Sequence, residues 1–395
     1  IERIMYNEFP YVFIIQGENM NKKLLILILI FIFINLNNSI AEDMNNENEL
    51  VRGKVLEILS EENLSYSEGQ TLKKQKIKLR LKHEHFEGKT IIVENHKDDM
   101  AAYNIDVNKG DEVLVYLEKD ENGDIINGYI TEIVRDKYLI YLGIIFFLLL
   151  ILVGGLKGLK SIITLLITAF AVIKIMLPLI LEGYNPIYLS VGISVIVIAI
   201  TLIIISGFNK KALTAIIGTT GGVIVAGIIT LIIGNLANLT GLGSQEAQML
   251  SIIPEGNNFN FKGILFSGII LGSLGAVMDV SMSIASSMNE IKIANPNIDT
   301  KDLIKSGMNV GKDIMGTMSN TLILAYSGGS IQLMLLFMAH DISLVEIINR
   351  DMIASEIVRA LAGSIGLIFT IPITALVAST LYKKVESTSE SKQNK

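Results

Sequence analysis

The chain has 395 residues, of which 50% are hydrophobic and 18% charged, with a net charge of −6 and a mean hydropathy of +0.51. This composition indicates an integral membrane protein whose first partner is the lipid bilayer, and it predicts no nucleic-acid partner. Cysteine is absent, which excludes disulfides, thiolate metal sites and cysteine nucleophiles.

The N-terminal part predicts a secretory signal. Residues 1–19 are interpreted as an untranslated leader, because Met20 is followed by Lys22 and Lys23 and then by an apolar run to Ile34. Small residues precede the end of this segment at Ala41, so residues 20–41 form a signal peptide that is expected to be cleaved. An uncleaved anchor helix is the alternative interpretation. Residues 42–49 form a polar linker.

Residues 50–137 predict a small β-domain. Five strand-like runs lie at 51–59, 75–82, 90–94, 113–117 and 125–134. The second run alternates, with Ile77, Leu79 and Leu81 inward and basic residues outward, which is typical of a half-buried strand. Five short strands separated by turn residues indicate a small extracytoplasmic β-barrel of the OB type.

Three histidines in this domain, His83, His85 and His96, are weak candidates for a metal site. His83 and His85 are two residues apart on a strand and therefore share a side, and imidazole is a common metal ligand. A solvated strand end is the alternative. No cofactor is expected.

Residues 138–382 predict about seven transmembrane helices, placed near 138–156, 161–181, 187–206, 212–235, 263–288, 311–338 and 354–382. Lysines gather in the loops that follow odd-numbered spans and in the tail, residues 383–395. The positive-inside rule therefore places the β-domain outside and the C-terminus inside a bacterial cytoplasmic membrane. The fold class is an α-helical polytopic membrane protein with a small β-barrel.

The span around Leu271–Glu290 carries a carboxylate, Asp279, inside an apolar segment. A helix turns about 100° per residue, so one side can be read from the sequence. That side holds Gly268, Gly272, Gly275, Asp279, Ser283, Ser286 and Glu290. The three glycines are assigned to helix packing, and the opposite side, with Ile270, Val277 and Ile284, is expected to face lipid.

The next span repeats this pattern, because Asn309, Asp313, Thr317 and Asn320 fall on one line of its helix. Ionisable groups in a membrane normally face a cavity or a partner, so the two spans together are interpreted as a polar path. A helix-locking hydrogen bond from Asp279 to Asn320 or Lys312 is the structural alternative.

Three segments, 272–291 (GSLGAVMDVSMSIASSMNEI), 306–330 (SGMNVGKDIMGTMSNTLILAYSGGS) and 356–376 (EIVRALAGSIGLIFTIPITAL), closely resemble the YibE/F-like family of bacterial membrane proteins. The resemblance covers residues from about 50 to 382. It implies a polytopic membrane protein regarded as a permease without an established substrate, and it supplies no catalytic residues.

Two functions follow as hypotheses. The first is a membrane permease or transporter of unknown substrate, coupled to protons or cations through the two polar spans. The second is a membrane scaffold or sensor whose β-domain binds an extracytoplasmic partner. An enzyme is not expected, because the sequence has no Walker A, HExxH or GxSxG motif. A homo-oligomer and a partner membrane subunit both remain open.

Overall fold

The computed structural model describes residues 49–382 except 67–69, 83–85, 87, 99–103, 121–123, 254–255 and 257–258. The expected leader, signal peptide and cytoplasmic tail, most of the linker, and His83 and His85, lie outside the described residues. The chain divides into two compact units, residues 1–155 and 156–395, and each is described by itself.

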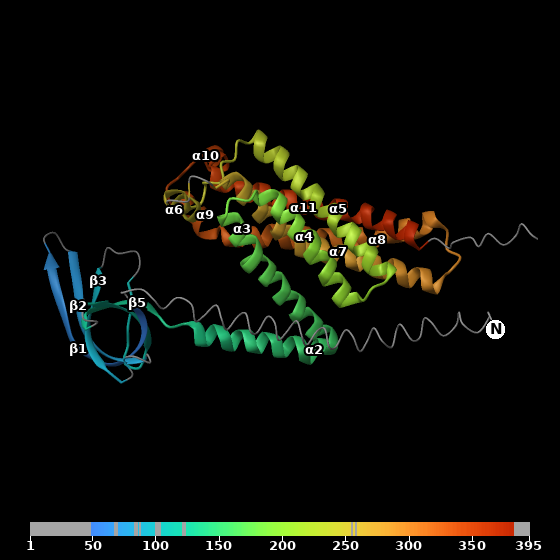
Figure 1. Cartoon of the computed structure of the whole chain (residues 1–395). Helices are drawn as coiled ribbons and strands as arrows, with labels where there is room; N and C mark the ends of the chain where they lie inside the picture. The colour runs from blue at the N-terminus through green and yellow to red at the C-terminus, as the bar shows by residue number, and fades with distance from the viewer. Residues whose placement is uncertain are drawn as a thin grey trace, which may run out of the picture. The chain divides into compact units, whose positions relative to one another are not determined.

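The first unit contains five antiparallel strands (Figure 1). They are β1 (Glu49–Tyr66), β2 (Gln70–Lys82), β3 (Thr90–Asp98), β4 (Glu112–Lys119) and β5 (Ile125–Ile133), in the sheet order β3-β2-β1-β4-β5. Strand β1 is much longer than the predicted run, because it pairs with β4 over its first residues and with β2 along nearly its whole length. The expected β-domain is confirmed as a barrel.

The barrel is nearly closed because its two outer strands, β3 and β5, approach each other. A side chain at Gly128 on β5 would place its Cβ 2.9 Å from a methyl group of Val93 on β3, so only glycine permits this approach. The predicted inward residues of β2, Ile77, Leu79 and Leu81, are buried in the barrel core with Val115. Alternation along β2 was therefore a correct guide to its inner side.

Ion pairs fasten the barrel to the helix that follows it. Glu112, the first residue of β4, accepts a hydrogen bond from Lys82 at 2.7 Å and forms an ion pair with Lys137. Arg52 pairs with Asp136, the first residue of helix α2 (Asp136–Phe170). Hydrogen bonds from the two lysines lower the pKa of Glu112 to about 2. The start of the apolar helix is thus held against one end of the barrel.

Replacing Glu112 by glutamine is expected to destabilise the barrel by about 1–3 kcal/mol at neutral pH. The folded-state pKa of Glu112 lies below its ordinary value of 4.5, so its stabilisation is present above pH 4.5 and is lost as the pH falls toward about 2. Because the chain has no tryptophan, Tyr116→Trp on β4 provides a fluorescence reporter of barrel unfolding alone. Unfolding of this reporter form at several pH values measures the effect.

Glu118→Gln is the matched control, since Glu118 lies on the same strand and, among the described residues, its side chain accepts only a long hydrogen bond of 3.4 Å from the Tyr129 hydroxyl. The Glu118 variant should be as stable at neutral pH as the form with both glutamates, and its stability should still fall between pH 4.5 and 2, because Glu112 is intact. Equal pH profiles for the Glu112 and Glu118 variants would contradict the role of the Glu112 ion pairs.

The remaining elements are helical. They are α2, the π-helix η2 (Ala171–Met176), α3 (Leu177–Leu181), α4 (Pro186–Ser206), α5 (Lys210–Leu236), α6 (Gln245–Ile252), α7 (Phe261–Ala294), α8 (Thr300–Gly329), α9 (Ile331–Ala339), α10 (Leu344–Asn349) and α11 (Asp351–Leu381). Among the described residues, five helical stretches are long and apolar enough to cross a membrane, or six if α8 and α9 form one bent span.

The expected number of seven spans is therefore not confirmed. The difference lies at residues 136–181, a helical stretch of 46 residues that contains both of the first two predicted spans. Such a stretch is about 70 Å long, more than twice the hydrocarbon thickness of about 30 Å. Its helix is interrupted at Gly155, where φ is 54°, between the two predicted spans.

The second unit is held together by close contacts among α5, α7 and α11. A Cβ at Gly222 on α5 would lie 1.7 Å from the Thr370 hydroxyl oxygen of α11, and a Cβ at Gly218 would lie 2.1 Å from that of Thr374. Ser281 of α7 bonds the backbone oxygen of Ala215 at 3.0 Å and lies 3.0 Å from the Thr374 hydroxyl. Small residues let these backbones approach, as is common between membrane helices.

Candidate functional site

The candidate site lies on α7 and α8, and α7 shows which of its sides faces protein. Ile270, Val277 and Ile284 are at most 1% exposed. Ile270 and Val277 lie against the α5 glycines Gly227 and Gly222. The expectation that this side faces lipid is wrong. It is the inner side of the helix, and its apolar residues fill the contact with neighbouring helices.

The opposite side of α7, which carries Asp279, is the outer surface of this unit. Gly268, Gly275, Asp279, Ser283 and Glu290 are exposed, while Ser286 is partly exposed. A Cβ added at Gly268 or Gly275 would meet nothing within 4 Å, whereas one at Gly272 would lie 2.4 Å from the Tyr326 hydroxyl of α8. Of the three glycines assigned to packing, Gly272 is therefore the one with a close neighbour among the described residues.

The polar residues that the sequence predicts on one side of α8 also lie on the surface of this unit. Asn309, Asp313, Thr317 and Asn320 are all exposed. The other side of the helix is buried, with Gly307 against the Met288 sulfur of α7 and Gly311 against Ile371 of α11. Each helix therefore uses one side for packing and leaves its polar side open.

Two contacts fix how α7 and α8 lie beside each other. Gly272 meets Tyr326, and Met288 meets Gly307, so the helices run antiparallel. Interpolation along the helices places Asp279 near the level of Thr317, and Asp313 near the level of Ser283, about 6 Å further along the axis. The structure thus brings the two carboxylates and their hydroxyl neighbours to similar levels along the axes of α7 and α8.

Asp279 has no hydrogen bond or ion pair with any residue in the described part of the chain. The same is true of Asn320 and Lys312, the two partners considered for a helix-locking bond. The arrangement leaves the Asp279 carboxylate open to water, to a cation or to groups from elsewhere.

A second cluster lies between α8 and α11. Glu356 and Arg359 form an ion pair at 2.8 Å, and the Arg359 guanidinium lies 5.9 Å from the Tyr326 ring centre. The Arg359 Nε atom is buried without a hydrogen-bond partner. A cavity of about 180 Å³ adjoins this cluster and extends to Ser330 and Met334. Only the fold brings Tyr326 to the pair.

The cavity also adjoins a break in the helices. Helix α8 ends at Gly329 and α9 begins at Ile331, with a bend of 57° between them. Two consecutive glycines, Gly328 and Gly329, precede the bend. Discontinuous helices next to charged groups are a recurring feature of sites in membrane transporters.

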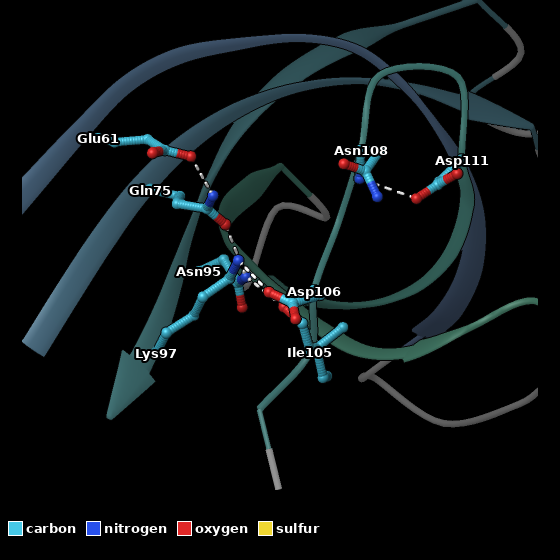
Figure 2. Close-up of polar contacts among 8 residues, drawn as sticks. All are labelled: Glu61, Gln75, Asn95, Lys97, Ile105, Asp106, Asn108 and Asp111. Atoms are coloured by element: carbon cyan, nitrogen blue, oxygen red, sulfur yellow. Dashed lines mark hydrogen bonds and ion pairs between the residues drawn. The ribbon is translucent and has the colours of Figure 1, made fainter. Parts of the chain in front are cut away.

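The barrel has a polar network of its own (Figure 2). The Gln75 side chain donates to Glu61 at 2.5 Å, and Asn95 donates to Gln75 at 3.2 Å and to the Ile105 backbone oxygen at 2.9 Å. Lys97 pairs with Asp106 in the same loop. Because Gln75 and Asn95 are buried and satisfied, the network holds the loop across the strands and indicates a structural role.

The described residues contain no group of three or more histidine, aspartate or glutamate side chains that would hold a metal ion. His96, the described member of the predicted metal candidates, lies 3.8 Å from Glu94 and is half exposed. Its partners His83 and His85 fall outside the described residues.

Long apolar helices joined to an N-terminal antiparallel barrel define the class of this chain, a helical membrane protein with a small β-domain. The family model of YibE/F-like proteins matches residues 142–384, and that of the YibE/F family N-terminal domain matches residues 51–133. The chain therefore belongs to the YibE/F-like family. Neither the curated proteins nor the solved structures contain a match.

Proposed function

We propose that this protein is a membrane permease whose polar path is lined by α7 and α8 and is coupled to protons or cations. One observation carries the proposal: Asp279 and Asp313 lie at similar depth on the open sides of two antiparallel helices, together with Ser283, Thr317 and Asn320. Hydrocarbon cannot hydrogen-bond to such groups, and a charge at the centre of a membrane helix costs about 2.5–3.5 kcal/mol on insertion scales. Water, a transported cation or further protein must therefore cover this surface.

The outer cluster extends this path. In the seven-span topology predicted from the sequence, α11 begins outside, so the pair of Glu356 and Arg359 lies in the outer half of the membrane. The same topology puts Asp279 and Asp313 in the inner half. Tyr326, which touches Gly272 of α7, links the two halves along α8. The bend between α8 and α9 is then suited to open or close the outer cavity.

Proton movement tests the proposal, because it requires no knowledge of the substrate. The purified full chain is reconstituted in liposomes that contain a pH-sensitive dye, and a potassium diffusion potential drives protons inward. The expected result is acidification faster than in protein-free liposomes. The flux of sodium and of potassium is measured in the same way. If the fluxes of protons, sodium and potassium all equal the leak of protein-free liposomes, the protein is not coupled to these ions.

The proposed sidedness can be measured directly because the chain has no native cysteine. Single cysteines at Lys109, an exposed turn of the barrel, and at Asn297, in the exposed connection between α7 and α8, should react with a membrane-impermeant maleimide from opposite sides. The Lys109 variant is expected to label in intact cells and the Asn297 variant only after permeabilisation. Labelling of both from the same side would refute this topology.

A membrane scaffold or sensor is the second candidate function. On β3 and β5, the two outer strands of the barrel, Ile92 and Ile126 are more than half exposed, and a partner bound at these strands would cover them. We also assign the barrel to the OB type, because β1 pairs with both β2 and β4 and the ends of the sheet approach through β3 and β5. A partner that copurifies with the full chain, combined with no ion movement in liposomes, would favour this function.

A further inference from the structure

A group of four cations on the outside of the barrel, Arg52, Lys54, Arg80 and Lys82, forms what is called here the cationic patch. All four side chains are exposed and point away from the core. The antiparallel register of β1 and β2 places Arg52 directly opposite Lys82, and Lys54 directly opposite Arg80. Two cation–cation pairs therefore lie side by side on one sheet surface.

Like charges that face each other across a strand pair destabilise a sheet. Ion pairs neutralise only half of this patch, since Arg52 pairs with Asp136 and Lys82 with Glu112. Glu112 also lies opposite Lys54 in the register of β1 and β4, but it forms its ion pairs with Lys82 and Lys137. Lys54 and Arg80 have no ion pair with any residue in the described ranges. An arrangement that folding alone would disfavour, and that the chain leaves half neutralised, indicates an anionic ligand.

The position of the patch indicates which anion. Asp136, which binds Arg52, is the first residue of α2, and Lys137 shares Glu112 with Lys82. The apolar part of α2 begins at the exposed Tyr138. Two residues of strand span about 7 Å, and the headgroup layer of a bilayer is about 5–7 Å thick. Lys54 and Arg80 thus lie within about one headgroup layer of the point where the chain enters the membrane.

We propose that the cationic patch binds the headgroups of anionic phospholipids. Guanidinium and ammonium groups form charge-assisted hydrogen bonds with phosphate oxygens, and Arg80 can do so with two nitrogens. Basic residues beside a membrane span are attracted to anionic lipid over a distance of about 8–10 Å. This inference concerns the barrel alone and does not depend on transport by α7 and α8.

The test uses the full chain in nanodiscs, with Tyr116→Trp as the reporter of barrel unfolding. The thermal midpoint is measured in phosphatidylcholine and in mixtures with phosphatidylglycerol at low salt. Phosphatidylglycerol is expected to raise the midpoint by about 5–10 °C, and about 0.5 M NaCl should remove most of the rise. Lys54→Gln with Arg80→Gln should remove most of it too, without lowering the midpoint in phosphatidylcholine, since the opposed charges are gone.

The double variant Lys73→Gln with Lys76→Gln is the control, because it removes the same amount of charge. Both residues lie nearer the start of β2, away from the cationic patch and α2. This control should retain the rise with phosphatidylglycerol. An equal loss in both double variants would show a general charge effect and overturn the proposal, as would a midpoint that does not depend on phosphatidylglycerol. A similar rise from soluble polyphosphate in phosphatidylcholine nanodiscs would assign the patch to soluble polyanions and also overturn it.

Discussion

Replacing Asp279 by asparagine is expected to reduce ion movement in liposomes about 100-fold or more, toward the leak of protein-free vesicles. The amide has nearly the shape of the carboxylate, but it does not bind and release a proton near neutral pH and carries no charge that would attract a cation. Because Asp279 has no partner among the described residues, its replacement leaves no other side chain of that part unsatisfied. Removing a charge should also ease insertion into the membrane.

The experiment compares proton flux at equal amounts of reconstituted protein. Asp313→Asn is expected to show the same loss, and the double variant should be no worse than either single variant, since both residues serve one path. Glu182→Gln, in the exposed connection between α3 and α4, is the matched control and should retain the flux. Full activity of Asp279→Asn at a normal protein level would end the coupling hypothesis.

Replacing Gly222 by alanine is expected to destabilise the second unit by about 1–3 kcal/mol or more. The new methyl group would lie 1.7 Å from the Thr370 hydroxyl oxygen, 2.8 Å from a Val277 methyl group and 2.9 Å from the Gly366 backbone oxygen. Two β-branched side chains and one backbone oxygen surround this point, so α5 and α11 must separate to admit the methyl group. The detergent-solubilised protein should unfold at a lower temperature and yield less monodisperse material.

Gly268→Ala provides the control on α7, because a Cβ there meets nothing within 4 Å. In a helix this change is otherwise neutral or stabilising by up to about 1 kcal/mol. Thermal stability of the two purified variants, measured in the same detergent, decides the matter. If Gly222→Ala is as stable as Gly268→Ala, the close contact of α5 with α11 is not as described.

The barrel could be predicted from sequence because water surrounds it. Inward apolar residues such as Leu79 alternate with outward cations on β2, and this contrast identifies the core side of a strand. The sequence did not reveal the length of β1 or its pairing with two different strands, because a strand pattern carries no information about its neighbours. The ion pairs of Glu112 join residues 25 and 30 positions apart and also depend on that pairing.

The sequence by itself determined that the chain enters a membrane, that it carries a β-domain, and which polar residues share one side of each helix. Only the tertiary structure decided which side of α7 packs against protein and brought Tyr326 to Arg359. The physical reason is that lipid tails and the interior of a helix bundle are equally apolar, so hydrophobicity does not separate an outer from an inner side. The two sides of a helix are distinguished instead by glycines and hydroxyl-bearing residues, which allow close backbone contact on the inner side. The structure shows such a contact between α5 and α11.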